Sequence, residues 1–171
     1  MESEEYLEIV DERGNVIGHA PRKAIHGNPS LMHRVVHILV VNRSGDILLQ
    51  KRSMKKDVAP GKWDTSVGGH VGVGEDLLSS SRREMFEELG IDGRDLEHLY
   101  SYVHTNAYET ELVTTFRCVC EDGFSINREE IDEVRFWTHE EIHRALGQRI
   151  LSDNFEHEFR MYLRYPMDSS L

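Results

Sequence analysis

The pattern of apolar and polar positions along the chain predicts several short strands. Residues 6–10 and 16–20 flank a turn-forming stretch, which is typical of a hairpin spanning about residues 5–20. Residues 35–41 are almost all apolar and mostly β-branched, so we expect a strand that is buried on both faces. Further strands are predicted over residues 46–51, 100–104, 112–120 and 134–137.

The spacing of apolar residues also predicts three helices. Residues 75–89 carry an apolar stripe made of Leu78, Met85 and Leu89, and a glycine follows that can end the helix. Residues 138–141 have the sequence of a capping box, which predicts a helix that continues to about residue 146. A last amphipathic helix is expected over residues 152–164, with an apolar face formed by Phe155, Phe159, Met161 and Leu163.

The order of these elements predicts the fold class. Strands, a helix, more strands and further helices indicate an α/β (α+β) sandwich with a central mixed sheet. Residues 21–31 carry neither pattern and are expected to be a linker. The length of 171 residues suits one domain covering residues 1–171, because single domains usually have about 100–200 residues.

Charge and composition narrow the class of partner. The formal net charge of -11 leaves no surplus of cations, so we expect neither a nucleic acid polymer nor a membrane as partner. No apolar run approaches the roughly 20 residues of a transmembrane helix, and the acidic first residues do not resemble a signal peptide. Cys118 and Cys120 are expected to be buried thiols, which fits a cytoplasmic location.

The helix over residues 75–89 carries the candidate chemistry. Glu84, Glu87 and Glu88 are three and four positions apart, so they share one helix face, where their charges repel one another. A hard, oxygen-preferring cation such as Mg²⁺ or Mn²⁺ would relieve that repulsion. Arg83 can pair with one of these carboxylates and hold it in position.

A glycine-rich loop precedes this helix. It contains Gly68, Gly69, Gly72 and Gly74, and such a loop lets backbone approach a phosphate closely. A divalent cation beside backbone donors is what the cleavage of a diphosphate requires. The alternative without a functional site, a solvated glutamate-rich surface helix, does not account for the fixed spacing of glycine, arginine and glutamate over residues 69–91.

Residues 69–91 match the Nudix box, G-x5-E-x7-R-E-U-x-E-E-x-G-U with U aliphatic, at every position. The chain therefore resembles the Nudix hydrolases. The resemblance implies Mg²⁺-dependent attack of water on a nucleoside diphosphate linked to a group X. It also implies that Glu84, Glu87, Glu88 and the carbonyl of Gly69 bind the metal, and that Arg83 orients a ligand. The general base varies in this family, so it can be a box glutamate or one from a later loop.

A narrower resemblance is to type I isopentenyl diphosphate isomerase. It implies a second metal site for Zn²⁺ or Mn²⁺, formed by His26, His33, His70, Glu109 and Glu111. The isomerase needs a cysteine just before its Gly-His pair, where this chain has Gly68, and its own box is degraded whereas this one is intact. These departures favour hydrolysis over isomerisation.

Several interpretations stay open at this point. Lys51, Arg52, Lys55 and Lys56 form either a phosphate clamp or a solvated basic loop, and Gly68 is a further candidate for phosphate binding. Glu111 is a candidate general base outside the box. The chain could instead be an isomerase or a non-catalytic module that binds diphosphates. The sequence identifies neither the group X nor the oligomeric state, for which a homodimer is one option.

Overall fold

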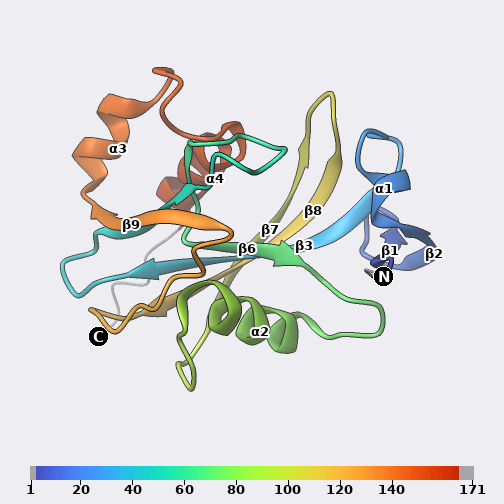
Figure 1. The fold of residues 1–171 in the computed structure, drawn as a ribbon, viewed down its shortest axis with the longest axis horizontal. Helices are drawn as coiled ribbons and strands as arrows, with labels where there is room; N and C mark the ends of the chain where they lie inside the picture. Colours follow the sequence, from blue (N-terminus) through green and yellow to red (C-terminus); the bar gives the residue numbers. More distant parts are fainter. Residues whose placement is uncertain (1–2, 166–171) are drawn as a thin grey trace.

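The computed structural model describes residues 3–165, and these residues form one curled mixed sheet with helices on both sides (Figure 1). The strands are β1 (Tyr6–Val10), β2 (Val16–Pro21), β3 (Met32–Val41), β4 (Ile47–Arg52), β5 (Trp63–Asp64), β6 (Val67–His70), β7 (Glu97–Thr105), β8 (Thr110–Val119) and β9 (Ile131–Trp137). The helices are α1 (Arg22–Ile25), α2 (Leu77–Leu89), α3 (His139–Ala145) and α4 (Asp153–Arg164). The predicted mixed-sheet fold is confirmed.

Strand β3 is the centre of the sheet. It pairs in parallel with β8 along its whole length, from Met32 beside Thr110 to Val41 beside Val119. It also pairs antiparallel with β1, β4 and β6, while β9 and β5 extend the sheet from β4 and β7 extends it from β8. This arrangement brings the glycine-rich β6 and the start of β8 to the same end of β3.

The alternating side chains of β3 pack into two apolar layers. Val36, Ile38 and Val40 belong to a buried cluster with α2, whereas Leu39 and Val41 belong to a second cluster with α4. Figure 1 shows α2 on one side of the sheet and α3 and α4 on the other. The prediction that this strand is buried on both faces is therefore confirmed.

Helix α2 is shorter than the sequence pattern predicts. It begins at Leu77 because the side chain of Asp76 accepts a hydrogen bond from the amide of Ser79 at 2.8 Å and so caps the first turn. The predicted apolar stripe is wrong at Leu78, which is 42% exposed in that first turn, although the other two residues of the stripe are buried. Gly90 ends the helix with a φ of 67°, a conformation that glycine adopts without strain.

Other boundary predictions have mixed outcomes. The expected linker over residues 21–31 contains α1, which is anchored by the fully buried Ile25. The capping box at Thr138 and Glu141 is confirmed, whereas Leu163, expected on the apolar face of α4, is 45% exposed.

The remaining sequence predictions concern the burial of the two cysteines and membrane-spanning helices. Cys118 and Cys120 are buried and free, as predicted. Within residues 3–165, no helix has the length and apolar character needed to cross a bilayer. Residues 1–2 and 166–171 of the predicted single domain lie outside the described residues.

Candidate active site

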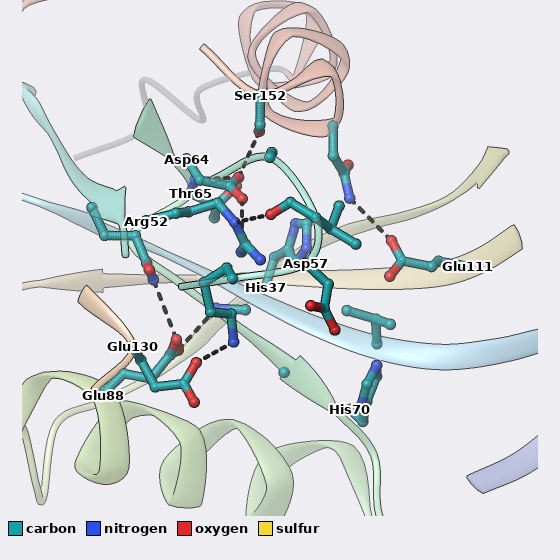
Figure 2. Close-up of a pocket in the computed structure, with 18 of the residues that line it drawn as sticks. His37, Arg52, Asp57, Asp64, Thr65, His70, Glu88, Glu111, Glu130 and Ser152 are labelled. Atoms are coloured by element: carbon teal, nitrogen blue, oxygen red, sulfur yellow. Dashed lines mark hydrogen bonds and ion pairs between the residues drawn. The ribbon is translucent and has the colours of Figure 1, made fainter. Parts of the chain in front are cut away.

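A cleft of about 870 Å³ opens beside the glycine-rich β6. Its walls come from α2, the loop between β4 and β5, the start of β8 and the start of α4. Figure 2 shows Glu88 and Glu130 on one side of the cleft and Glu111 and His70 on the other, with His37 between them. A cleft of this size suits a small-molecule ligand, since such sites usually measure about 300–1,000 Å³.

The three box glutamates of α2 all line this cleft. Glu87 is exposed, Glu84 is half-buried and Glu88 is buried, so together they run from the rim to the floor. Arg83 donates hydrogen bonds to Glu84 at 2.7 Å and to Glu75 at 3.1 Å, and it forms an ion pair with Glu87 at 3.4 Å. One guanidinium therefore fixes the carboxylates of Glu84 and Glu87 relative to each other.

Burial changes the pKa of two of these carboxylates, because it disfavours their ionised form. Burial raises the pKa of Glu88 to about 8, and the nearby Glu84 adds to the effect. Its oxygens accept hydrogen bonds from the Gln50 side chain at 3.3 Å and from the Gly68 amide at 3.2 Å. Burial also raises the pKa of Glu84, although Arg83 opposes the shift. A cation at this position would favour the ionised form of both groups.

The close approach of β6 to α2 requires glycine at position 69. A Cβ on Gly69 would lie 2.1 Å from Cδ of Glu84, which is closer than real atoms come. Any other residue would therefore push the glutamate out of place. The backbone of Gly69 and the carboxylate of Glu84 share the same small space, as expected if both bind one ion.

The five residues expected from the isomerase resemblance also come together. His26, His33 and His70 have ring centroids 5.2–5.7 Å apart, and Nε2 of His26 lies 3.4 Å from Nε2 of His70. Nε2 of His33 lies 3.9 Å from an oxygen of Glu109 and 3.8 Å from an oxygen of Glu111. One ligand atom from each histidine lies within 4.8 Å of the others, and the same holds for His33 with the two glutamates.

The electrostatics of this histidine cluster suit a cation. His33 is fully buried, yet neither ring nitrogen has a hydrogen-bond partner within the described part of the chain. Burial and the neighbouring His70 lower the pKa of His33 to about 3 and that of His26 to about 4. Burial raises the pKa of Glu109 and of Glu111. The rings of His26 and His33 are therefore neutral near pH 7, and their nitrogens offer lone pairs to a cation.

The predicted basic loop divides between two environments. Arg52 lines the cleft and is held by the carbonyl of Val58 at 2.8 Å and by Asp64 at 3.4 Å. Lys56 also lines the cleft and forms an ion pair with Glu130. Lys51 is not among the lining residues, because side chains alternate along β4 and its neighbours Gln50 and Arg52 point into the cleft. The predicted contact of Lys51 with substrate is therefore corrected.

His37 and Asn154 also line the cleft, although neither was predicted from the sequence as a site residue. Asn154 donates a hydrogen bond to Glu111 at 3.0 Å and so fixes the orientation of that carboxylate. His37 is the one titratable side chain among the apolar residues 35–41, and that isolation was a usable signal. Asn154 has no comparable signal, because only the docking of α4 brings it to β8.

The fold and the site together define a class of hydrolases, and comparisons with known proteins agree. The NUDIX domain model matches residues 31–158. An uncharacterized Nudix hydrolase of Yersinia pestis is 41% identical over 143 residues, covering 81% of this chain and 75% of that protein. The structure of DR0079 from Deinococcus radiodurans has a TM-score of 0.78 at 24% identity, covering 91% of this chain and 98% of that one. The NUDIX domain of Shewanella oneidensis NrtR, solved with ADP ribose, has a TM-score of 0.59 at 16% identity, covering 83% of this chain and 90% of that one.

This chain belongs to the Nudix family. It is a hydrolase that acts on the pyrophosphate bonds of acid anhydrides. Members of the family generally use a divalent metal ion. The membership of the Nudix family that residues 69–91 predicted is confirmed.

Proposed function

We propose that this protein is a Mg²⁺-dependent hydrolase that cleaves the diphosphate linkage of a nucleoside diphosphate joined to a group X, or of a related small-molecule diphosphate. The observation that carries the proposal is the row of Glu84, Glu87 and Glu88 along one wall of the cleft, beside the backbone of Gly69. Arg83 holds the first two, and the amide of Gly68 binds the third. Water is the nucleophile, and it attacks at phosphorus.

The residues of α2 fit a hard divalent cation. Burial raises the pKa of both Glu84 and Glu88, and a bound cation would offset that cost of ionisation. Glu84, Glu87, Glu88 and the carbonyl of Gly69 would hold Mg²⁺, with Mn²⁺ as a substitute. When bound, the ion supplies neutralisation of phosphate charge and activation of water. Arg83 keeps the carboxylates of Glu84 and Glu87 in place.

The histidine cluster fits a second divalent ion, Zn²⁺ or Mn²⁺. The two nitrogens of His33 are buried without partners, and a buried polar group in that state is costly unless something binds it. His26, His70, Glu109 and Glu111 supply the remaining donor atoms. Imidazole with carboxylate is a typical donor set for these two metals.

Two further observations support a diphosphate substrate. Arg52 and Lys56 line the same cleft as the box glutamates and can bind the phosphate oxygens that the metal leaves free, with the backbone of Gly68 nearby. The relative NrtR from Shewanella oneidensis binds ADP ribose, which is a nucleoside diphosphate linked to a sugar. Glu111, oriented by Asn154, is the candidate general base outside the box.

A substrate screen tests this function. The purified chain is incubated with Mg²⁺ and a panel of diphosphates that includes ADP-ribose, and the products are identified by mass. We expect release of two phosphorylated products, and we expect Glu87→Gln to lower turnover at least about 100-fold. The matched control is Glu140→Gln, which removes an exposed carboxylate on α3 away from the cleft. Equal losses in both variants, or none in either, would contradict the proposal.

Two other functions are tested with the same diphosphates but in separate assays, because an isomer has the same mass as its substrate and binding alone forms no product. Conversion of isopentenyl diphosphate to dimethylallyl diphosphate would support the isomerase interpretation, although Gly68 offers no side-chain proton donor. Thermal stabilisation by a diphosphate without any turnover would support a non-catalytic binding module.

A further inference from the structure

Glu158 is a carboxylate in an unusual place. It lies on α4 without any exposed surface, and its neighbours on the same helix, Phe155 and Phe159, are part of the apolar core. A charge buried in such a place destabilises a protein by several kcal/mol unless it is paired and hydrogen-bonded. The partners of Glu158 therefore determine whether it can remain ionised.

Four donors surround this carboxylate. Tyr100 and Thr115 donate to Oε1 at 2.5 and 2.9 Å. Tyr102 and Nδ1 of His37 donate to Oε2 at 2.5 and 2.9 Å. An ionised carboxylate offers about four acceptor positions, so the donors match its full capacity. Burial would raise the pKa of Glu158, but the hydrogen bond and charge of His37 hold it below its usual value.

The other edge of the His37 ring faces the cleft. His37 is a lining residue, and its Nε2 has no hydrogen-bond partner within residues 3–165. A Cβ at Gly68 would lie 3.3 Å from Cδ2 and 3.4 Å from Nε2 of the ring, so the imidazole takes the space that a side chain at position 68 would need. The amide of Gly68 in turn donates to Glu88, which places the ring next to the metal-binding wall.

The charges around His37 favour the imidazolium. Burial would lower the pKa of His37, but Glu158 raises it above its usual value, and Glu111 and Asp64 add to that effect. His104 also faces this region, and the charge of His37 helps to lower its pKa. Tyr102 contacts Nδ1 at 3.5 Å and does not compete for Nε2. With Nδ1–H bonded to Glu158, a proton on Nε2 points into the cleft.

We propose that His37 is a substrate-binding residue, whose Nε2–H donates a hydrogen bond to an anionic oxygen of the bound diphosphate, and that Glu158 is the positioning residue that holds the imidazolium. The inference rests on the proposed function, because it requires a diphosphate in the cleft. The imidazolium of His37 would then be a cation on the floor of the cleft, between the metal-binding wall of α2 and Glu111. No spacing along the chain links the two residues, since they are 121 positions apart.

The first experiment measures binding of imidodiphosphate, a pyrophosphate analogue whose bridge resists hydrolysis, by calorimetry with Mg²⁺ present. We expect His37→Gln to weaken binding about ten-fold or more, because it removes a charge-assisted hydrogen bond. The matched control is His98→Gln, which makes the same change on β7 outside the cleft. A His37→Gln protein that binds as tightly as wild type would overturn the role of His37 alone. A wild-type protein that does not bind imidodiphosphate would overturn the proposed function and this inference with it.

The second experiment starts from wild-type protein, so the state of His37 and its response to imidodiphosphate are measured without relying on a variant that folds. Nitrogen-detected NMR of the histidine side chains reports the protonation of both ring nitrogens. We expect His37 to be doubly protonated at pH 7, its Nε2 signal to shift when imidodiphosphate is added, and Glu158→Gln to remove the doubly protonated form. A neutral His37, or an Nε2 signal that does not respond to imidodiphosphate, would overturn the proposal.

Discussion

The substitution Glu88→Gln separates the stability of the metal-free protein from its activity. It replaces a buried carboxyl group with an amide of the same shape. Burial raises the pKa of Glu88 to about 8 from its usual 4.5. At pH 7 without metal, the folded protein therefore keeps Glu88 protonated, whereas the unfolded chain ionises it.

The sign and size of the effect follow from that difference. A raised pKa in the folded state gives a contribution that is fully present below pH 4.5 and is lost as the pH rises towards 8. From pH 4.5 to 7 is 2.5 units, and each unit is worth about 1.4 kcal/mol, so wild type loses about 3 kcal/mol through this group. Glutamine does not ionise, so the variant avoids the loss.

Thermal melts in EDTA measure the prediction. At pH 7 we expect Glu88→Gln to melt several degrees above wild type, since 1 kcal/mol shifts the melting temperature of a chain of this size by about 2–4 °C. At pH 5 the gap should shrink to about a quarter of its size at pH 7, because only about 0.8 kcal/mol has been lost by then. Added Mg²⁺ should stabilise wild type but not the variant, and the variant should be inactive. The control is Glu87→Gln, whose side chain is 53% exposed and should melt like wild type in EDTA. Equal melting temperatures for Glu88→Gln and wild type at pH 7, or the same gap at both pH values, would refute the reasoning.

Three further predictions concern activity. Gly69→Ala should lower turnover at least about 100-fold while the chain still folds, because the new Cβ would displace Glu84; full activity would mean that this approach is irrelevant to catalysis. Glu111→Gln should lower kcat about 100-fold with little change in KM, as removal of a general base does; unchanged kcat would return the base to α2. Lys51→Ala should leave KM unchanged whereas Arg52→Ala should raise it, because only Arg52 lines the cleft; equal KM values for both variants would argue against a phosphate contact by Arg52.

The local parts of the site are predictable from the sequence. Glu84, Glu87 and Glu88 share a helix face because their spacing is short, and nothing remote is needed to bring them together. The capping box at Thr138 and the strand over residues 35–41 are local patterns of the same kind, and both are confirmed. The prediction for Leu78 is wrong because this residue is exposed in the first turn of α2, and a helical stripe does not show which turns of a helix are covered.

The remaining parts depend on contacts between distant segments. The parallel pairing of β3 with β8 brings His33 beside Glu111, and no local pattern specifies that register. The meeting of His37 with Glu158 depends on how α4 docks, so no local pattern predicts the pair. Lys51 and Arg52 differ only in which way β4 turns them, and that depends on the pairing of β4 with β9 and β5.

The most direct test of the central claim is the position of the metal. A crystal grown with Mn²⁺ and imidodiphosphate, measured at the manganese absorption edge, locates each ion by its anomalous scattering. We predict a peak within bonding distance of the carboxylates of Glu84, Glu87 and Glu88 and of the carbonyl of Gly69, with the diphosphate beside it. A well-ordered diphosphate in the cleft with no manganese at α2 would contradict the account.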